Sequence, residues 1–428
     1  MKTLIKNGNV LYNSQLQKLD VLFDEEQILE VGENLEDKEA EIIDASNLAV
    51  LPGLVDTHVH LRDPGYTAKE TIATGTKAAA HGGFTTVFAM PNLKPFPSTP
   101  EVMKAYLENI KANAVVDVFP FGTITDNEQG KVPTDYEALK ELGIVWFSDD
   151  GVGVASDAVM EEAMTKAARA GVLFSCHTED MDYRRPGASV HDSEAVTSKG
   201  WLGIPSACEY AQLQRDLELV LKTGVKYHAD HISAKESVES LAKAKAEGAD
   251  VSAEVTVHHL LLEDKDVQGP NWKMNPPLRS HADRMALIEG LESGALDFIA
   301  NDHAPHTVQE KARPMDKAPF GIVSLETAFP LLYTEFVWRT KRWTLNQLVE
   351  WMSLKPAVRF GLKKTGRIEP GFKSDLFLAD LNTQAVIDKT EFESMGKNTP
   401  FDGWESRCVI KETFKNGKSV WKEERKPK

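Results

Sequence analysis

The chain has 428 residues and a net charge of −16, from 49 basic and 65 acidic residues. This length favours one large domain with a smaller second one. An acidic balance without runs of Lys or Arg argues against a nucleic-acid partner. No run of about eighteen apolar residues is present, so we expect no membrane span. The polar first twenty residues and three widely spaced cysteines, Cys176, Cys208 and Cys408, lead us to expect a cytoplasmic protein.

The two ends of the chain predict a small β domain. Near the start, LIKNGNVL, KLDVLFDEEQILEVG and AEIIDASNLAVLPG are of strand character, with turns expected at Asn-Gly and Gly-Glu-Asn. A similar alternation returns in RIEPGFKSDLFLADLN and RCVIKETFKNGKSVWKEE. We therefore expect residues 1–50 and 363–428 to form one β domain around a central domain of residues 51–362.

The central region predicts an α/β fold, a (β/α)8 TIM barrel. Apolar runs of strand length alternate with segments rich in Ala, Glu and Lys, which commonly end in Gly as helices do. Eight such alternations are typical of this barrel. The strands are LVDTHVHL, TTVFAMPN, VVDVFPFGTIT, GIVWFSDDG, VLFSCHTED, VKYHADHIS, VSAEVTVHH and LDFIANDHAPH.

Several of these strands begin apolar and end in His, Asp, Glu or Asn, at the barrel end that carries active sites. On the first strand, alternation places His58, His60 and Arg62 on one face. Imidazole pairs at this spacing suit zinc, although a lone His-X-His also occurs on exposed strands. The fifth, sixth and eighth strands add further histidines and carboxylates. The fourth ends in Asp149 and Asp150, and alternation leaves open which of them faces the same pocket.

The motifs DTHVHLRDPG, AMPN, SDDG, CHTED, HADHIS, KMNPPLR, NDHAPH and APFGI occur in this order, followed by GRIEPGFKSDLFLAD. In these motifs the chain resembles the class I dihydroorotases of the amidohydrolase superfamily over nearly its whole length. The resemblance implies a hydrolase acting on cyclic amides in de novo pyrimidine (UMP) biosynthesis. The implied reaction is the reversible, metal-dependent cyclisation of N-carbamoyl-L-aspartate to L-dihydroorotate with loss of water.

The resemblance also implies two divalent metal ions per chain, which we expect to be zinc. Strand four lacks the carboxylated lysine that bridges the two metals in many superfamily members, so an aspartate takes that place. Asp302 is the implied catalytic residue, which accepts a proton and passes it to the departing amide nitrogen. The implied ligands are His58, His60 and Asp302 for one ion, His177 and His231 for the other, and Asp150 between them.

The substrate contacts implied by the resemblance come from the same motifs. Arg62, Asn92 and His306 would hold the substrate carboxylate. Asn275 and the backbone of Phe320 and Gly321 would read the ring amides. The polar segment 306–319 is long for a barrel connection, and we expect an irregular loop that orders over the substrate.

His228, His258 and His259 are expected to be structural. Asn301 stands where relatives often have Thr, and Val257 where many have Pro. Two other functions fit the same pattern: a hydantoinase, dihydropyrimidinase or allantoinase, and an inactive homologue serving as a structural partner. The absent lysine and Arg62 argue against the first, and the complete ligand set argues against the second. A homodimer and an association with aspartate transcarbamoylase are further expectations.

Overall fold

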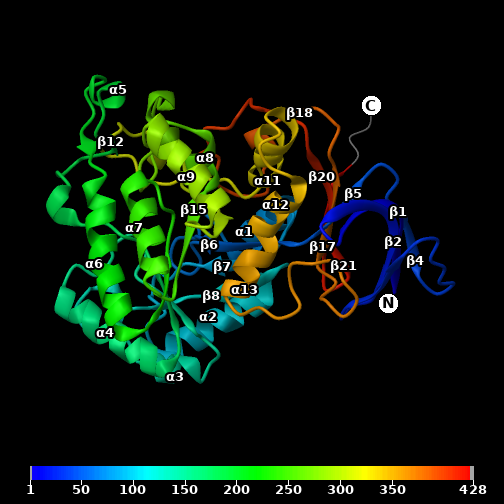
Figure 1. Cartoon of the computed structure of the whole chain (residues 1–428), viewed down its shortest axis with the longest axis horizontal. Coiled ribbons are helices and arrows are strands. Elements are labelled where there is room, and N and C mark those ends of the chain that lie inside the picture. Colours follow the sequence, from blue (N-terminus) through cyan, green and yellow to red (C-terminus); the bar gives the residue numbers. More distant parts are fainter. Residues whose placement is uncertain (1, 425–428) are drawn as a thin grey trace.

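The computed structural model describes residues 2–424; Met1 and residues 425–428, which the predicted β domain includes, lie outside the described residues. Strands from the two chain ends form one eight-stranded sheet beside a barrel of helices and strands (Figure 1). The expected joining of the two ends is therefore confirmed, while the domain limits at residues 51 and 362 stay predictions. The sheet contains β1 (Thr3–Tyr12), β2 (Gln15–Phe23), β3 (Ile28–Gly32), β4 (Glu41–Asp44), β5 (Ala49–Pro52), β17 (Leu376–Asp380), β20 (Val409–Lys415) and β21 (Lys418–Lys422).

The Asn7-Gly8 dipeptide does not form the expected turn. It lies inside β1, where the register with β2 shifts, and Asn7 has a φ of 62°. The hairpin turn between these strands is formed instead by Asn13 and Ser14, with φ values of 49° and 64°. A positive φ at both positions is typical of tight hairpin turns. The sequence pattern was wrong here because a bulge and a turn both use residues that tolerate the left-handed region.

The barrel strands pair in parallel, as predicted. One group of strands runs in the order β6-β7-β8 and the other in the order β16-β15-β14-β11-β10-β9. The predicted third strand is divided: β8 pairs with β7, whereas β9 pairs with β10. The barrel strands are β6 (Leu54–Val59), β7 (Phe84–Ala89), β8 (Asp117–Pro120), β9 (Gly122–Thr123), β10 (Trp146–Ser148), β11 (Leu173–Cys176), β14 (Lys226–Ala229), β15 (Val251–Thr256) and β16 (Phe298–Ala300).

Backbone contacts connect the last barrel strand to the first. Val59 and His303 form a parallel bridge. The N–H of His60 donates to the carbonyl oxygen of His303 at 2.9 Å. These bonds lie at the ends of the strands from which the predicted site residues come, so they fix the first and eighth strands beside each other at the mouth.

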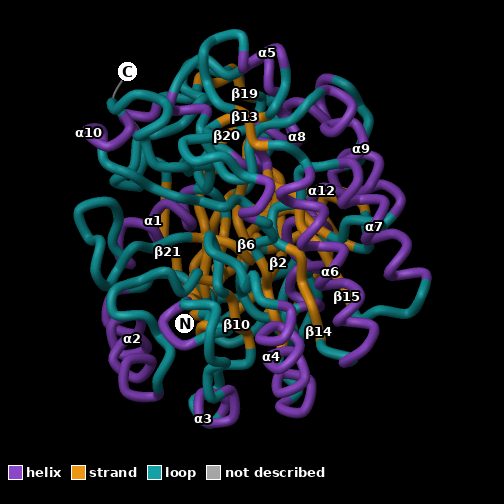
Figure 2. Tube along the Cα trace, turned by 90° about the vertical axis from the view of Figure 1, so that its left-hand side faces the viewer, coloured by secondary structure: helices purple, strands orange, loops and turns teal. Residues whose placement is uncertain are grey.

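Helices surround the strands, which gather at the centre of the molecule (Figure 2). The predicted helical segments are confirmed, and α4 ends before Gly171, whose φ of 69° suits the end of a helix. No helix within residues 2–424 combines the length and apolar character needed to cross a bilayer. The main helices are α1 (Ile72–His81), α2 (Pro100–Asn113), α3 (Tyr136–Lys140), α4 (Asp157–Ala170), α6 (Ala207–Thr223), α7 (Lys235–Ala246), α9 (His281–Ser293), α11 (Ala328–Leu332), α12 (Leu345–Val349) and α13 (Lys355–Arg359).

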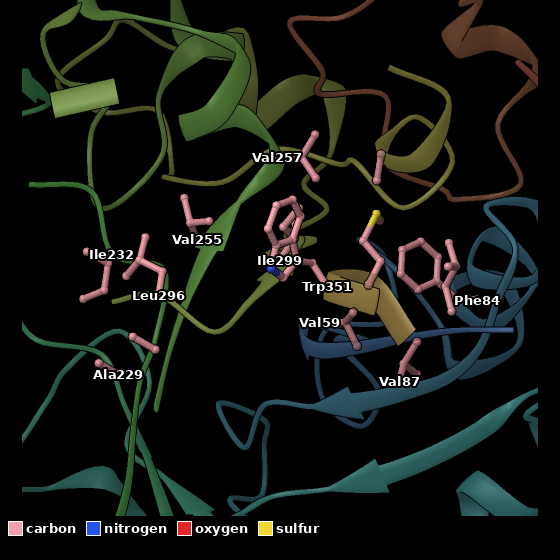
Figure 3. Close-up of a cluster of buried hydrophobic side chains, with 14 of the residues drawn as sticks. Val59, Phe84, Val87, Ala229, Ile232, Val255, Val257, Leu296, Ile299 and Trp351 are labelled. Carbon is pink, nitrogen blue, oxygen red and sulfur yellow. The ribbon is translucent and has the colours of Figure 1, made fainter. Parts of the chain in front are cut away.

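Buried apolar side chains from the strands pack against those of the helices. Val59 and Val87 come from neighbouring strands, and Trp351 lies in the same cluster (Figure 3). Val255 and Ile299 continue this cluster on β15 and β16. Because the strands are covered on both faces, their sequences are continuously apolar, and polar residues appear where the strands end.

A buried ion pair ties the terminal sheet to the barrel. Lys415 of β20 lies 2.7 Å from Asp375 and 2.7 Å from Asp117 of β8. We predict that Lys415→Met lowers the free energy of unfolding by about 3 to 5 kcal/mol, because it leaves Asp375 buried without its cation. Urea denaturation measures the change. Lys418→Met is the control, since that exposed side chain pairs with Glu25 and should contribute under about 1 kcal/mol. Equal losses in the two variants would contradict the prediction.

Candidate metal centre and active site

The six side chains predicted as metal ligands lie together at the carboxyl-terminal mouth of the barrel. Each of them ends or follows a barrel strand, and parallel strands bring such residues to one edge. All six are buried. They are His58 in β6, His60 just after it, Asp150 after β10, His177 after β11, His231 after β14 and Asp302 after β16.

The Asp150 carboxylate lies at the centre of this group. Its Oδ1 atom is 3.5 Å from His58 Nε2 and 3.6 Å from His231 Nε2. The same oxygen is 3.8 Å from His177 Nδ1, and Oδ2 is 3.5 Å from His60 Nε2. Burial alone would raise the pKa of Asp150, but the charge of His58 and its neighbours holds that pKa well below its usual value. An ionised carboxylate is therefore shared between imidazoles on two sides.

Asp302 completes the group on one side. Its Oδ1 atom is 3.0 Å from His60 Nε2 and 3.6 Å from His58 Nε2. Burial would raise the pKa of Asp302, but the hydrogen bond with His60 and the charge of His58 lower it to about 2. On the other side, His177 Nδ1 lies 3.0 Å from His231 Nε2. The ligand atoms thus form two neighbouring sets that meet at Asp150.

These two sets fit divalent ions. Atoms bound tetrahedrally to zinc lie about 3.4 Å from one another, given bonds of about 2.0–2.1 Å. The distances of 3.0 to 3.8 Å in both sets match that spacing. In addition, His58 Nε2 and Asp150 Oδ1 are buried and have no hydrogen-bond partner among residues 2–424. Such orphaned atoms are costly unless a ligand satisfies them.

The neighbouring Asp149 points away from this cluster. Its carboxylate accepts hydrogen bonds from the N–H of Thr125 at 3.1 and 3.2 Å and from the hydroxyl of the same residue. Burial raises the pKa of Asp149 to about 7. The structure therefore brings Asp150, and not Asp149, to the histidines, a choice that strand alternation alone left open.

Glu254 of β15 is a carboxylate that the sequence analysis missed. Its oxygens lie 2.9 Å from His58 Nδ1 and 3.1 Å from His228 Nε2. Burial would raise the pKa of Glu254, but hydrogen bonds from these two histidines lower it. His228 also lies 2.8 Å from the Ser252 hydroxyl and is structural, as expected. A lone acidic residue inside the apolar strand VSAEVT was the available signal, and Glu254 orients the His58 ring toward Asp150.

Val257, His259 and Asn301 also have structural roles, and His258 is buried beside them. Val257 is the first residue of α8 (Val257–Leu261), a helical position that Pro also suits, so this departure from the family leaves the geometry intact. The ring of His259 lies 3.2 Å from the carbonyl oxygen of Pro276. Burial lowers the pKa of His258 well below its usual value. Asn301 donates to Asp56 at 2.8 Å and thereby ties the eighth strand to the first.

Three of the predicted site residues have positive φ angles: 61° at Arg62, 33° at His231 and 47° at Asp302. This backbone region is rarely occupied by residues other than Gly, and it costs free energy that the surrounding structure must offset. Strain of this kind concentrates at functional sites. Its occurrence at three strand ends around one cavity marks the mouth of the barrel as the functional site.

A cavity of about 360 Å³ opens beside the metal-ligand cluster. Every residue predicted to contact the substrate lines this cavity. Arg62 donates from Nε to the carbonyl oxygen of Pro305 at 3.3 Å, and its Nη2 atom is 3.5 Å from His306 Nε2. The lining residues are His60, Arg62, Asn92, Asp150, Gly151, His177, Arg184, His231, Asn275, Asp302, Ala304, His306, Phe320 and Gly321.

The two asparagines at this cavity have protein partners that the sequence did not indicate. Asn92 donates to Asp150 Oδ2 at 3.0 Å, and its Oδ1 atom is 2.9 Å from His60 Nδ1. Asn275 donates to Glu179 Oε2 at 2.9 Å. Glu179, the glutamate of the CHTED motif, also pairs with Arg184. Asn92 therefore contacts two of the predicted metal ligands, His60 and Asp150, in addition to facing the cavity.

The segment after the eighth strand is more ordered than expected. It contains α10 (Val308–Lys311), and the ammonium group of Lys311 is buried and donates to the carbonyl oxygens of Pro319 at 3.1 Å and Gly321 at 2.9 Å. The N–H of Gly321 donates to the carbonyl oxygen of Lys273 at 2.9 Å. A substrate that used this N–H would have to replace that bond. Closure of the segment over a substrate stays a prediction.

Comparison with known proteins identifies the family. The "Dihydro-orotase-like" family model matches residues 48–237. The dihydroorotase of Halalkalibacterium halodurans is 50% identical over 426 residues, covering 99% of both chains. That of Geobacillus kaustophilus is 52% identical over 393 residues, covering 91% of both. The chain belongs to the dihydroorotase family.

Solved structures agree with this placement in the amidohydrolase superfamily. The L-hydantoinase (dihydropyrimidinase) of Arthrobacter aurescens is similar with a TM-score of 0.88 and 27% identity, over 98% of this chain and 96% of that one. The expected TIM barrel with a small β domain is thereby confirmed. The six predicted metal ligands of this chain lie in one cluster at the barrel mouth.

We predict that Asp150→Ala lowers the metal content of the folded protein by about one ion per chain or more, because it removes the carboxylate shared by both ligand sets. Inductively coupled plasma mass spectrometry measures metal per chain. Asp149→Asn is the matched control, since that carboxylate faces Thr125, and its metal content should equal that of the wild type. Full metal content in a folded Asp150→Ala variant would contradict the assignment.

Proposed function

We propose that this chain is a dihydroorotase: it catalyses the reversible cyclisation of N-carbamoyl-L-aspartate to L-dihydroorotate, with loss of water, in de novo UMP biosynthesis. One observation carries the proposal: the Asp150-centred ligand cluster and the guanidinium of Arg62 face the same cavity. A cyclic amide that also carries a carboxylate would use both. The relatives that bear the name dihydroorotase, at about half identity over nearly the full length, support the same reaction.

The cluster would hold two divalent ions, and imidazole and carboxylate ligands favour zinc. We assign His58, His60 and Asp302 to one ion and His177 and His231 to the other, with Asp150 shared between them. When bound, the ions supply Lewis acidity, which polarises a carbonyl group and makes water more acidic.

Asp302 is the proposed proton carrier. The hydrogen bond with His60 and the charge of His58 lower the pKa of Asp302 and keep it ionised. An ionised carboxylate beside the cavity has a free oxygen lone pair that can accept a proton from water. During ring opening the water oxygen bonds to the carbonyl carbon, the amide C–N bond breaks, and the nitrogen gains the proton that Asp302 has taken from water. During ring closure the carbamoyl nitrogen bonds to the carboxylate carbon and gives a proton to Asp302, which passes it to the departing oxygen. A second proton from solution completes the water that leaves. Both directions use the same carboxylate.

Recognition of the acid substrate is assigned to the other side of the cavity. Arg62 presents a planar fork that suits a carboxylate, and Asn92 and His306 lie beside it. Asn275 and the backbone of Phe320 and Gly321 would contact the ring amides. A neutral cyclic amide would leave the half-buried guanidinium of Arg62 without a substrate anion, so this arrangement favours dihydroorotate over hydantoin or dihydrouracil.

For cellular context we propose a cytoplasmic homodimer. The three free, buried cysteines are compatible with a reducing compartment. The dimer, and an association with aspartate transcarbamoylase, are supported by the family resemblance.

We predict that the purified protein interconverts N-carbamoyl-L-aspartate and L-dihydroorotate, measured by absorbance and by chromatography of both compounds. Arg62→Ala should lower kcat/KM by an amount equivalent to roughly 2 kcal/mol or more of activation free energy, because a charge-assisted hydrogen bond to the substrate is lost. Arg62→Lys keeps the charge without the planar fork and should recover part of the loss.

Chelation separates this function from its rivals. Removing metal should abolish turnover, and adding zinc should restore it. Dihydrouracil and allantoin serve as competing cyclic amides. Faster turnover of either of them than of dihydroorotate would contradict the proposed function, and unchanged kinetics of Arg62→Ala would remove the carboxylate assignment.

A further inference from the structure

One segment of the C-terminal part of the chain lies against the barrel mouth. This segment, residues 392–401, lies between the short helix η7 (Lys389–Glu391) and β19 (Glu405–Ser406). It is held by a hydrogen bond from the Ser394 hydroxyl to Glu70. A Cβ atom added at Gly396 would lie only 2.7 Å from side chains of Pro305 and Val323. The backbone at Gly396 is therefore in close contact with the chain that follows the eighth strand. The segment brings Asn398 against the loop that follows the eighth strand.

Both polar atoms of the Asn398 side-chain amide form hydrogen bonds with that loop. Its Oδ1 atom accepts from the N–H of His306 at 3.1 Å. Its Nδ2 atom donates to the carbonyl oxygens of Ala304 and Gly321, both at 3.0 Å. The carbonyl oxygen of Asn398 accepts from the N–H of Val323 at 2.9 Å. The side chain is buried, with 3% exposed.

These three partners, Ala304, His306 and Gly321, all line the cavity beside the metal-ligand cluster. They come from the two ends of one loop, which Asn398 holds side by side. The approach is close: Gly321 has a φ of 121°, and a Cβ atom there would lie 2.6 Å from the Cβ of Ala304. Two further bonds connect these loop ends: the N–H of Ala304 donates to the carbonyl oxygen of Ile322 at 2.7 Å, and His306 Nε2 lies 2.7 Å from the carbonyl oxygen of Phe320. Asn398 adds the connection that bonds to the backbone of both His306 and Gly321.

We propose that Asn398 is a positioning residue for the substrate pocket, which sets His306 and the Gly321 backbone at the spacing that dihydroorotate requires. This inference rests on the proposed function. Asn is suited to the task because one side chain must offer two donors to two carbonyl groups and one acceptor to an N–H. An aspartate would turn an acceptor toward both carbonyl oxygens. An apolar residue would remove the partner of the His306 N–H and of the Ala304 carbonyl oxygen, and would leave Lys311 as the partner of the Gly321 carbonyl oxygen.

The test is Asn398→Asp, with Thr399→Val as the matched control. Thr399 is also buried in the segment, and its hydroxyl accepts from the N–H of Phe401. We expect Asn398→Asp to raise KM for dihydroorotate roughly tenfold or more while kcat stays within about threefold, since displaced binding groups weaken recognition first. Metal content should equal that of the wild type, and hydrogen exchange should accelerate across residues 304–323. Thr399→Val should retain the wild-type KM.

A KM within about twofold of wild type in folded, metal-loaded Asn398→Asp would overturn the inference, as would an equal rise in Thr399→Val. If Asn398→Asp does not fold, Asn398→Ala decides by the same criteria, because water can enter the space that the smaller side chain leaves. Wild-type protein that does not turn over dihydroorotate would instead refute the proposed function. In that case unchanged exchange across residues 304–323 in the variant would refute the positioning role separately.

Discussion

The buried Asp150 carboxylate, within 3.5 to 3.8 Å of four imidazoles, is the interaction on which the site depends. A charge in such a place is costly unless neighbours compensate it, and these four imidazoles come from the ends of three different strands. Parallel barrel strands bring the ends of segments distant in sequence to one edge at a common depth. The hydrogen bond from His60 to His303, which connects the first strand to the last, is therefore part of the site as much as of the fold.

Residues on two sides of the ligand cluster hold its side chains and the cavity wall in place. Beneath the cluster, Glu254 orients His58 from inside the barrel. Above it, Lys311 and Asn398 both bond to the carbonyl oxygen of Gly321 and hold the cavity wall. The terminal sheet and the segment that returns from it thus contribute to the pocket as well as to stability. The positive φ of Asp302 costs free energy that the surrounding contacts must offset.

Sequence patterns predicted the barrel, the joining of the chain ends and the gathering of histidines and carboxylates at the strand ends, because each rests on a local rule: strand alternation, apolar runs and polar strand ends. The resemblance to the dihydroorotase family supplied the choice of six ligands. Alternation could not choose between Asp149 and Asp150, since it gives relative and not absolute direction. Glu254 and Asn398 were missed because their partners lie far away in the sequence, 196 and 92 residues for the bonds to His58 and His306. The bulge at Asn7-Gly8 was mistaken for a turn because both conformations favour the same residues.

Anomalous diffraction at the zinc edge, from crystals of the active protein grown with zinc, measures how many ions the Asp150-centred cluster holds. We expect two peaks about 3.5–4 Å apart, one on either side of the Asp150 carboxylate. One set of imidazoles, including His60, should contact the first peak, and the other, including His231, the second. A single peak in fully active protein, or two peaks with Asp150 bound to neither, would contradict it.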